Sequence, residues 1–166
     1  LSRGIKEVIS SGWFLKGPHT KAIELRIGNR FGDRPVVTVG NGTDALYLAL
    51  KAADVGPGKA VATVANAGGY TAGVTLRLGA VPVLVDADPV TAQMSADALL
   101  KVINSVDVVV ATHLYGLVGQ IEEISAICAE AGVTLIEDCA QALGAKHAGQ
   151  PVGTFGEYAT TSFSFY

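Results

Sequence analysis

Glycine, histidine, acidic and hydroxyl residues stand at the ends of several apolar runs of this sequence. Gly42 and Thr43 follow the run VVTVG, His113 ends DVVVATH, Asp138 ends GVTLIED, and Ser164 lies near the end of ATTSFSF. Backbone N–H groups of a Gly-Thr turn at a helix start bind phosphate well. If the apolar runs are neighbouring strands, all five residues lie at one edge of a sheet. We therefore treat them as candidates for one binding site.

Each candidate also has a structural explanation that involves no ligand. Thr43 or Asn41 can cap the helix that follows them. Asp138 can cap a turn or a helix, and Ser164 can bond to the backbone inside a buried strand. His113 can be satisfied by hydrogen bonds within a turn. Residue type and position alone leave the two interpretations of each residue open.

The elements that must position these residues alternate between apolar strands and amphipathic helices. We expect strands at 36–40, 60–65, 81–86, 107–113, 132–138 and 159–165, and helices at 44–53, 71–78, 95–102 and 120–131. Strands that are apolar throughout are buried on both faces, as in parallel sheets covered by helices. The sequence predicts an α/β fold with a mostly parallel sheet and helices on both faces. Ligands of such sheets bind beyond the carboxyl ends of the strands.

Composition limits the class of protein. The chain has 166 residues, of which 49% are hydrophobic and 16% charged, which suits one packed domain. Its longest apolar stretch is interrupted by Asp107 and His113, and its net charge of -3 is spread without a basic stripe. We therefore expect neither a membrane span nor a nucleic-acid partner. Cys128 and Cys139 lack metal-type spacing, so we expect both to be buried in a protein of the reducing cytoplasm.

The segment GNGTDA (40–45) fits the G-x-G-x-x-A fingerprint of dinucleotide-binding proteins. That site also needs an acid about 20 residues further on, which holds the ribose hydroxyls. The corresponding stretch, AVATVANAGG, contains no acid. The dinucleotide interpretation is therefore disfavoured, whereas phosphate binding at Gly42 and Thr43 remains possible.

Several segments, in this order and spacing, resemble a known family. They are SGWFLKGP (11–18), NGTDAL (41–46), PVLVDADP (82–89), HLYG (113–116), IEDCAQALGA (136–145) and SFSFY (162–166). Together they resemble the DegT/StrS-type nucleotide-sugar aminotransferases, which are pyridoxal-phosphate enzymes of the aspartate aminotransferase fold, fold type I. The resemblance covers nearly the whole chain.

The resemblance implies roles around the ring of pyridoxal 5'-phosphate. Asp138 matches the acid that pairs with the protonated pyridine nitrogen and so keeps the ring electron-accepting. Gln141 matches a glutamine beside the ring, although it can equally be an exposed or capping amide. His113 matches a position that lines the site, and we take it with Asp138 as catalytic.

The resemblance also implies a phosphate site and one departure from the family. Gly42, Thr43 and Ser164 match the residues that bind the cofactor phosphate. The family places an aromatic ring over the cofactor at the position of Gly68, which has no side chain. Tyr70, two residues later, could supply that ring, or it could simply pack.

By this resemblance, the lysine that binds the cofactor covalently belongs three positions beyond Tyr166. None of the seven lysines of the chain stands at that place. We therefore expect residues 1–166 to be a truncated large, cofactor-binding domain, without the small C-terminal domain, and to be inactive alone. The strand at 36–40 would then lack its immediate partner.

The function that the resemblance implies is transfer of an amino group from an amino acid, such as glutamate, to a nucleotide-linked keto sugar. The family also implies a homodimer, with the segment 11–18 as a candidate for its interface. Two alternatives stay open. One is a sugar dehydratase of the same fold, in which histidine replaces the lysine. The other is a truncated, cofactor-free remnant without catalytic activity.

Overall fold

The computed structural model describes residues 2–164, and the chain divides into two compact units, Leu1–Thr38 and Val39–Tyr166. The first unit contains helices α1 (Ser2–Ser11) and α2 (Pro18–Arg30). Proline suits the first position of α2, because the N–H that it lacks would have no helical acceptor there. The Glu24 carboxylate accepts hydrogen bonds from the N–H and the hydroxyl of Thr38, which ties the end of this unit to α2.

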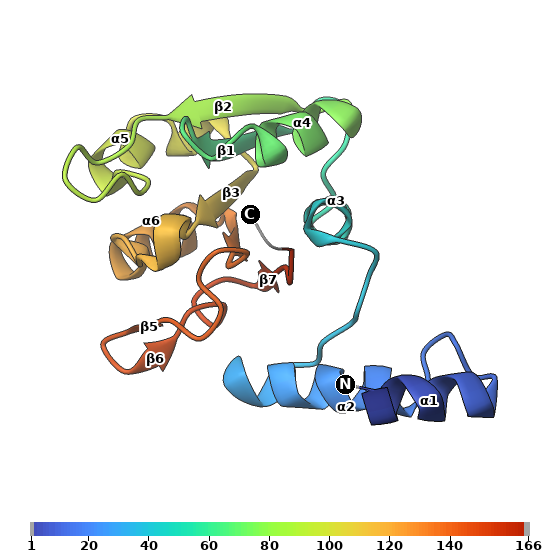
Figure 1. Cartoon of the computed structure of the whole chain (residues 1–166). Helices are drawn as coiled ribbons and strands as arrows, with labels where there is room; N and C mark the ends of the chain where they lie inside the picture. Colours follow the sequence, from blue (N-terminus) through green and yellow to red (C-terminus); the bar gives the residue numbers. More distant parts are fainter. Residues whose placement is uncertain (1, 165–166) are drawn as a thin grey trace. The chain divides into compact units, whose positions relative to one another are not determined.

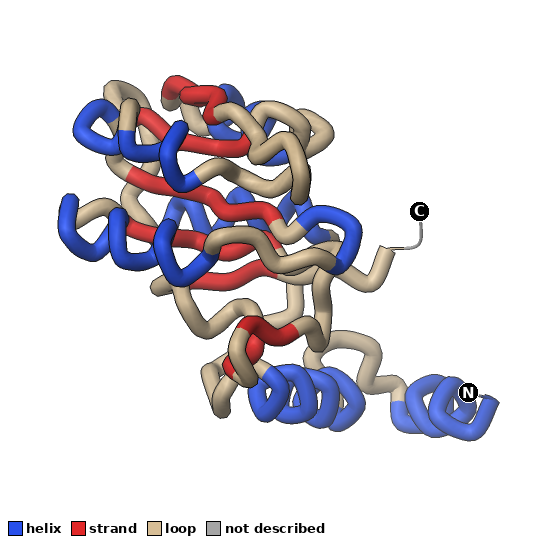
Figure 2. The backbone as a smooth tube through the Cα atoms, turned by 90° about the vertical axis from the view of Figure 1, so that its left-hand side faces the viewer, coloured by secondary structure: helices blue, strands red, loops and turns tan. Residues whose placement is uncertain are grey.

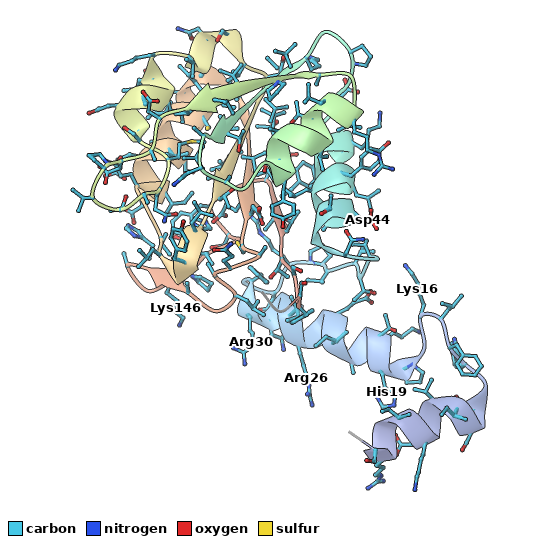
Figure 3. All side chains as sticks on the ribbon, turned by 45° about the horizontal axis from the view of Figure 1, so that its top comes forward. Lys16, His19, Arg26, Arg30, Asp44 and Lys146 are labelled. Atoms are coloured by element: carbon cyan, nitrogen blue, oxygen red, sulfur yellow. The ribbon has the colours of Figure 1, made fainter. Side chains whose placement is uncertain are left out.

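Polar side chains cover part of α2. Arg26 and Arg30 are exposed and extend outward from this helix (Figure 3). Ile27 and Phe31 are buried, with 7% and 6% of their surface exposed. The helix therefore has one exposed polar face and one buried apolar face.

The second unit is built on a parallel sheet of five strands (Figure 1). Its strands are β1 (Ala60–Val64), β2 (Val81–Val85), β3 (Val108–Thr112), β4 (Thr134–Asp138) and β7 (Tyr158–Thr160), in the spatial order β2-β1-β3-β4-β7. All four strand pairings in this sheet are parallel. This confirms the fold class that the apolar runs predict.

Helices cover both faces of this sheet, as Figure 2 shows. On one face α3 (Gly42–Ala52) and α4 (Tyr70–Arg77) pack on the sheet through a cluster that includes Leu50, Val74 and Ile136. On the other face α5 (Ala96–Leu100) and α6 (Ile121–Ala131) contribute to a cluster around Leu99 and Ile124. Burial on both faces explains why the strands are apolar throughout.

Short elements complete the second unit. Two 3-10 turns, η1 (Ile103–Ser105) and η2 (Leu114–Gly116), flank β3. Strands β5 (Lys146–His147) and β6 (Gln150–Pro151) pair antiparallel as a small hairpin. No helix within residues 2–164 is long and apolar enough to cross a membrane. Cys128 and Cys139 are buried and free, as predicted.

One predicted strand is absent, and another is shorter than predicted. Residues 36–40 belong to no strand, because no strand in the described part of the chain lies beside them to complete a ladder. The strand expected at 159–165 is only β7, since its last register partner is Asp138, where β4 ends. Residues 161–164 continue without regular structure, and residue 165 lies outside the described range.

Candidate functional site

Three adjacent strands end on one row of polar residues. In the sheet register Thr112 of β3 faces Asp138 of β4, which faces Thr160 of β7. Facing residues of parallel strands point to the same side, here the side covered by α3 and α4. The sequence therefore places a carboxylate between two hydroxyls at the carboxyl edge of the sheet, where ligands of α/β folds bind.

Asp138 is buried, with 6% of its surface exposed, and among residues 2–164 only its Oδ1 has hydrogen-bond donors. Oδ1 accepts from the Ala140 N–H at 3.1 Å and from the Thr160 hydroxyl at 3.4 Å. Burial raises the pKa of Asp138, although these bonds and the charge of His113 oppose that effect. Within residues 2–164, no group donates to Oδ2.

A desolvated carboxylate with a free oxygen is suited to a cationic partner. The protonated pyridine nitrogen of pyridoxal 5'-phosphate is such a partner, because it supplies one N–H donor and one positive charge. The residues of this site therefore fit the cofactor that the sequence motifs suggested.

The start of α3 offers unpaired N–H groups. Asn41 caps the helix, since its side-chain oxygen accepts from the N–H of Asp44 at 2.8 Å, and its backbone oxygen accepts from Ala45 at 3.0 Å. The N–H groups of Gly42 and Thr43 are left without an acceptor among the described residues. Capping by Asn41, rather than by Thr43, is thus compatible with an anion at the other two N–H groups.

The segment after β7 packs directly on this helix start. A Cβ added at Gly42 would lie 3.0 Å from the Cβ of Ser162 and 3.2 Å from its Oγ. Ser164, the predicted phosphate ligand, is exposed two residues further, and its N–H donates to the Ser162 hydroxyl at 3.2 Å. Sequence reasoning missed Ser162, although it stands in the same S-F-S motif.

The same segment connects the helix start to Asp138. The Cys139 N–H donates to the Thr160 carbonyl at 2.8 Å, and the Thr161 hydroxyl donates to the Cys139 carbonyl at 3.3 Å. Thr160 contacts the carboxylate, and Ser162 contacts Gly42. Residues far apart in sequence, Gly42, Asp138 and Ser162, thus come together around one short segment.

His113 is turned to the other side of the sheet, where it bonds to a buried acid. Its Nε2 lies 3.0 Å from Oε2 of Glu137, and the two side chains are 3% and 0% exposed. Glu137 also accepts from the N–H groups of Gly153, Phe155 and Gly156 at 2.7 to 2.8 Å. Burial raises the pKa of Glu137, but the bonds from His113 and the backbone lower it overall.

Glu137 is a second site residue that sequence reasoning missed. Its signal was an acid within an otherwise apolar strand, immediately before Asp138. His113, Glu137 and Cys139 offer ligand atoms within 4.8 Å of one another. Both Glu137 oxygens already accept hydrogen bonds, and burial raises the pKa of Cys139, so a hydrogen-bond network explains this cluster better than a metal.

The HLYG turn is held by two glutamine side chains. Buried Gln93 accepts from the Leu114 N–H at 3.0 Å and donates to its carbonyl at 3.1 Å. Gln141 accepts from the Tyr115 N–H at 2.8 Å, where Tyr115 has a φ of 61°. This bond fixes the orientation of the Gln141 amide and leaves its NH2 group available to donate to a ligand.

Tyr70 occupies the space that Gly68 leaves. It begins α4 and is 51% exposed. A Cβ added at Gly68 would lie 3.3 Å from Cε2 of the Tyr70 ring. The ring thus leans back over Gly68, the position at which the sequence comparison expected an aromatic side chain.

Comparison with known proteins identifies the family that these motifs resemble. A sequence model of the DegT/DnrJ/EryC1/StrS aminotransferase family matches residues 2–166. Over 164 residues the chain is 41% identical to the pleiotropic regulatory protein of Geobacillus stearothermophilus, covering 98% of the chain and 44% of that protein. It is 36% identical over 161 residues to the UDP-N-acetyl-3-dehydro-alpha-D-glucosamine 3-aminotransferase of Acidithiobacillus ferrooxidans, covering 96% of the chain and 44% of the enzyme.

Two further relatives bear on cofactor and fold. The chain is 34% identical to EpsN of Bacillus subtilis, whose name describes a pyridoxal phosphate-dependent aminotransferase, over 96% of the chain and 43% of that protein. The crystal structure of 3-amino-5-hydroxybenzoic acid synthase superposes with a TM-score of 0.93 at 32% identity, over 98% of the chain and 43% of that structure. The chain therefore spans less than half the length of these relatives.

Proposed function

Because the chain belongs to the DegT/DnrJ/EryC1/StrS aminotransferase family, we propose that it binds pyridoxal 5'-phosphate at the carboxyl edge of its sheet. The observation that carries this proposal is Asp138, a buried carboxylate that residues 160–162 join to the start of α3. Among residues 2–164, one oxygen of Asp138 has no donor, and the N–H groups of Gly42 and Thr43 have no acceptor. Residues 1–166 then belong to the large, cofactor-binding domain of an aminotransferase.

In this proposal Asp138 holds a proton on the ring nitrogen. When bound, the cofactor supplies an electron-accepting ring and a carbon that can carry an amino group. The carboxylate gains a charge-assisted hydrogen bond in a desolvated place, which offsets the cost of burying it. Thr160 and Ala140 fix its other oxygen, so that Oδ2 is free to accept from the ring.

The phosphate binds at the start of α3. The N–H groups of Gly42 and Thr43 donate to it, and the positive end of the helix dipole favours its charge. Ser162 adds a hydroxyl, supported by its contact with Gly42. Ser164 adds another, two residues further along the chain.

Two side chains bind the ring, and a third, on the other side of the sheet, fixes the strand end that carries Asp138. Tyr70 stacks on the ring, supported by its exposure and its position over Gly68. Gln141 donates a hydrogen bond from its NH2 group to the cofactor, because the Tyr115 N–H fixes the orientation of its amide. His113 acts through Glu137, which fixes the end of β4 next to Asp138.

We further propose that the amino group passes from an amino acid, such as glutamate, to a nucleotide-linked keto sugar. The relative named as a UDP-N-acetyl-3-dehydro-glucosamine aminotransferase supports this substrate class. Exposed Trp13, Phe14 and Leu15 support a homodimer interface at residues 11–18. Two free, buried cysteines support a reducing, cytoplasmic location.

The proposal is tested by incubating the full-length protein that contains residues 1–166 with pyridoxal 5'-phosphate, glutamate and a UDP-linked 3-keto sugar. We expect equal amounts of 2-oxoglutarate and amino sugar, measured by mass spectrometry. Loss of water from the sugar, without consumption of glutamate, would identify the dehydratase alternative. A protein that neither binds the cofactor nor changes the sugar would contradict both enzymatic readings.

A further inference from the structure

Two buried threonine hydroxyls have no hydrogen-bond partner among residues 2–164. They are Oγ1 of Thr63 and Oγ1 of Thr112, whose residues are 1% and 8% exposed. A buried hydroxyl without a partner is unfavourable compared with an apolar side chain of the same shape. Each of these threonines therefore requires an explanation, either from packing or from a partner that is bound only part of the time.

Thr112 differs from Thr63 in what lies beside it. In the sheet register Thr112 faces Asp138, whereas Thr63 faces Val110. Neighbouring strands are about 4.8 Å apart, so a rotation about the Cα–Cβ bond can bring a threonine hydroxyl within reach of the facing side chain. Asp138 accepts from Thr160 on its other side through Oδ1, and its Oδ2 has no donor in the described chain.

We propose that Thr112 is a positioning residue, whose hydroxyl donates to Oδ2 of Asp138 when the ring nitrogen of pyridoxal 5'-phosphate is bound there. This inference rests on the function proposed above. Each carboxylate oxygen can accept two hydrogen bonds, so Oδ2 can bind the ring N–H and the Thr112 hydroxyl together. Two threonines, one from each neighbouring strand, then keep the carboxylate ionised and the proton on the ring.

The ionisable side chains near Asp138 do not bond to its carboxylate, so we assign this role to a neutral donor. His113 and Glu137 lie on the other side of the sheet and bond to each other. On the Asp138 side, none of the ionisable residues of α3, α4 and β7 bonds to its carboxylate; these are Asp44, Tyr47, Lys51, Tyr70, Arg77 and Tyr158. The threonines are therefore the hydroxyl donors that the sheet itself aligns with Asp138.

The chain offers a matched control for the substitution Thr112→Val. Thr63→Val removes an equally buried and unpaired hydroxyl on the same side of the sheet, one strand away from the Thr112–Asp138 pair. Without cofactor, we expect both variants to unfold at the same urea concentration as the original protein or at a higher one. Thr112→Ser keeps a hydroxyl and serves as the rescue variant.

The test is titration of each variant with pyridoxal 5'-phosphate, followed by 15N NMR of the bound cofactor labelled at the ring nitrogen. We expect Thr112→Val to bind about tenfold more weakly, with a 15N resonance shifted towards the unprotonated ring, because one hydrogen bond to the charged carboxylate is lost. Thr63→Val and Thr112→Ser should retain the original affinity and resonance.

Different failures are distinguishable in the same experiment. If the original protein binds the cofactor and Thr112→Val behaves identically, the inference about Thr112 is overturned while the proposed function stands. Equally weakened cofactor binding by Thr63→Val would also overturn it, because that result would reflect a general change in packing. If the original protein binds no cofactor, the proposed function fails and this inference fails with it.

Discussion

Glu137 and Asp138 are adjacent acids with different surroundings on opposite sides of the sheet. Four donors surround the Glu137 carboxylate, which has both oxygens bonded. Within the described chain Asp138 has one oxygen without a donor, and burial raises its pKa. At the residue scale, the fully bonded acid stabilises the fold, and the partly bonded acid is available for a ligand.

Glu137→Gln should destabilise the protein by about 2–4 kcal/mol, because an amide presents N–H groups to backbone donors in a buried place. The pKa of Glu137 is lowered on folding, so its contribution is fully present above the ordinary value of 4.5 and is lost as the pH falls. Urea unfolding at several pH values between roughly 3 and 7, a range that includes ordinary carboxyl titration, measures this loss of stability. Glu122→Gln, at an exposed acid of α6, is the control and should change little.

Asp138→Asn should weaken binding of pyridoxal 5'-phosphate about 10- to 100-fold, because a charge-assisted hydrogen bond becomes a neutral one. The same variant should be more stable than the original protein without cofactor at pH 7. Burial raises the pKa of Asp138, so its charge opposes folding at neutral pH, and this difference vanishes below the ordinary value of 3.8. If the Asn variant binds the cofactor with unchanged affinity, Asp138 is not part of the site.

At the scale of elements, the start of α3 and the segment after β7 must approach closely. Gly42→Ala adds a Cβ about 3.0 Å from that of Ser162, so one of the two elements has to move. We expect weaker cofactor binding with little loss of stability, since alanine favours helix more than glycine does. Gly73→Ala in α4 is the control, because its added Cβ meets nothing within 4 Å. Fluorescence titration with pyridoxal 5'-phosphate measures the cofactor affinity of both variants.

The amino ends of β1 and β3 are joined by an ion pair away from the site. Lys59 Nζ lies 2.8 Å from Asp107 Oδ1, and Oδ2 accepts from the Ala60 N–H at 2.8 Å. The bonds from Lys59 and Ala60 lower the pKa of Asp107. Asp107→Asn should therefore lower the urea midpoint at pH 7, and the difference should shrink as the pH falls below 3.8. Unchanged cofactor affinity would show that this pair is structural.

Most elements could be predicted from the sequence, because periodicity and caps are local. Ser95 caps α5 by accepting from Ala98, and Gly79 follows α4 with a φ of 76°, as the residue types suggest. The strand predicted at 36–40 was wrong, because strand pairing depends on neighbouring strands that the local sequence pattern does not reveal. Glu137, Ser162 and Thr112 were missed for the same reason, since their significance lies in contacts across the sheet.

At the scale of the whole molecule, exposed apolar side chains at residues 13–15 suggest self-association. Trp13, Phe14 and Leu15 are 54%, 68% and 82% exposed. If residues 11–18 form a dimer interface, Phe14→Asp should convert a dimer to a monomer, because a charge would be buried without a partner. Light scattering measures the mass of both proteins. A monomeric original protein, or a dimer unaffected by the substitution, would contradict this interface.

The most direct measurement is a crystal structure of the protein with pyridoxal 5'-phosphate bound. We predict that the ring nitrogen lies within hydrogen-bond distance of the Asp138 carboxylate, and that the phosphate contacts the N–H groups of Gly42 and Thr43. A cofactor bound elsewhere on the chain, or one whose phosphate lies away from the start of α3, would contradict the proposed site.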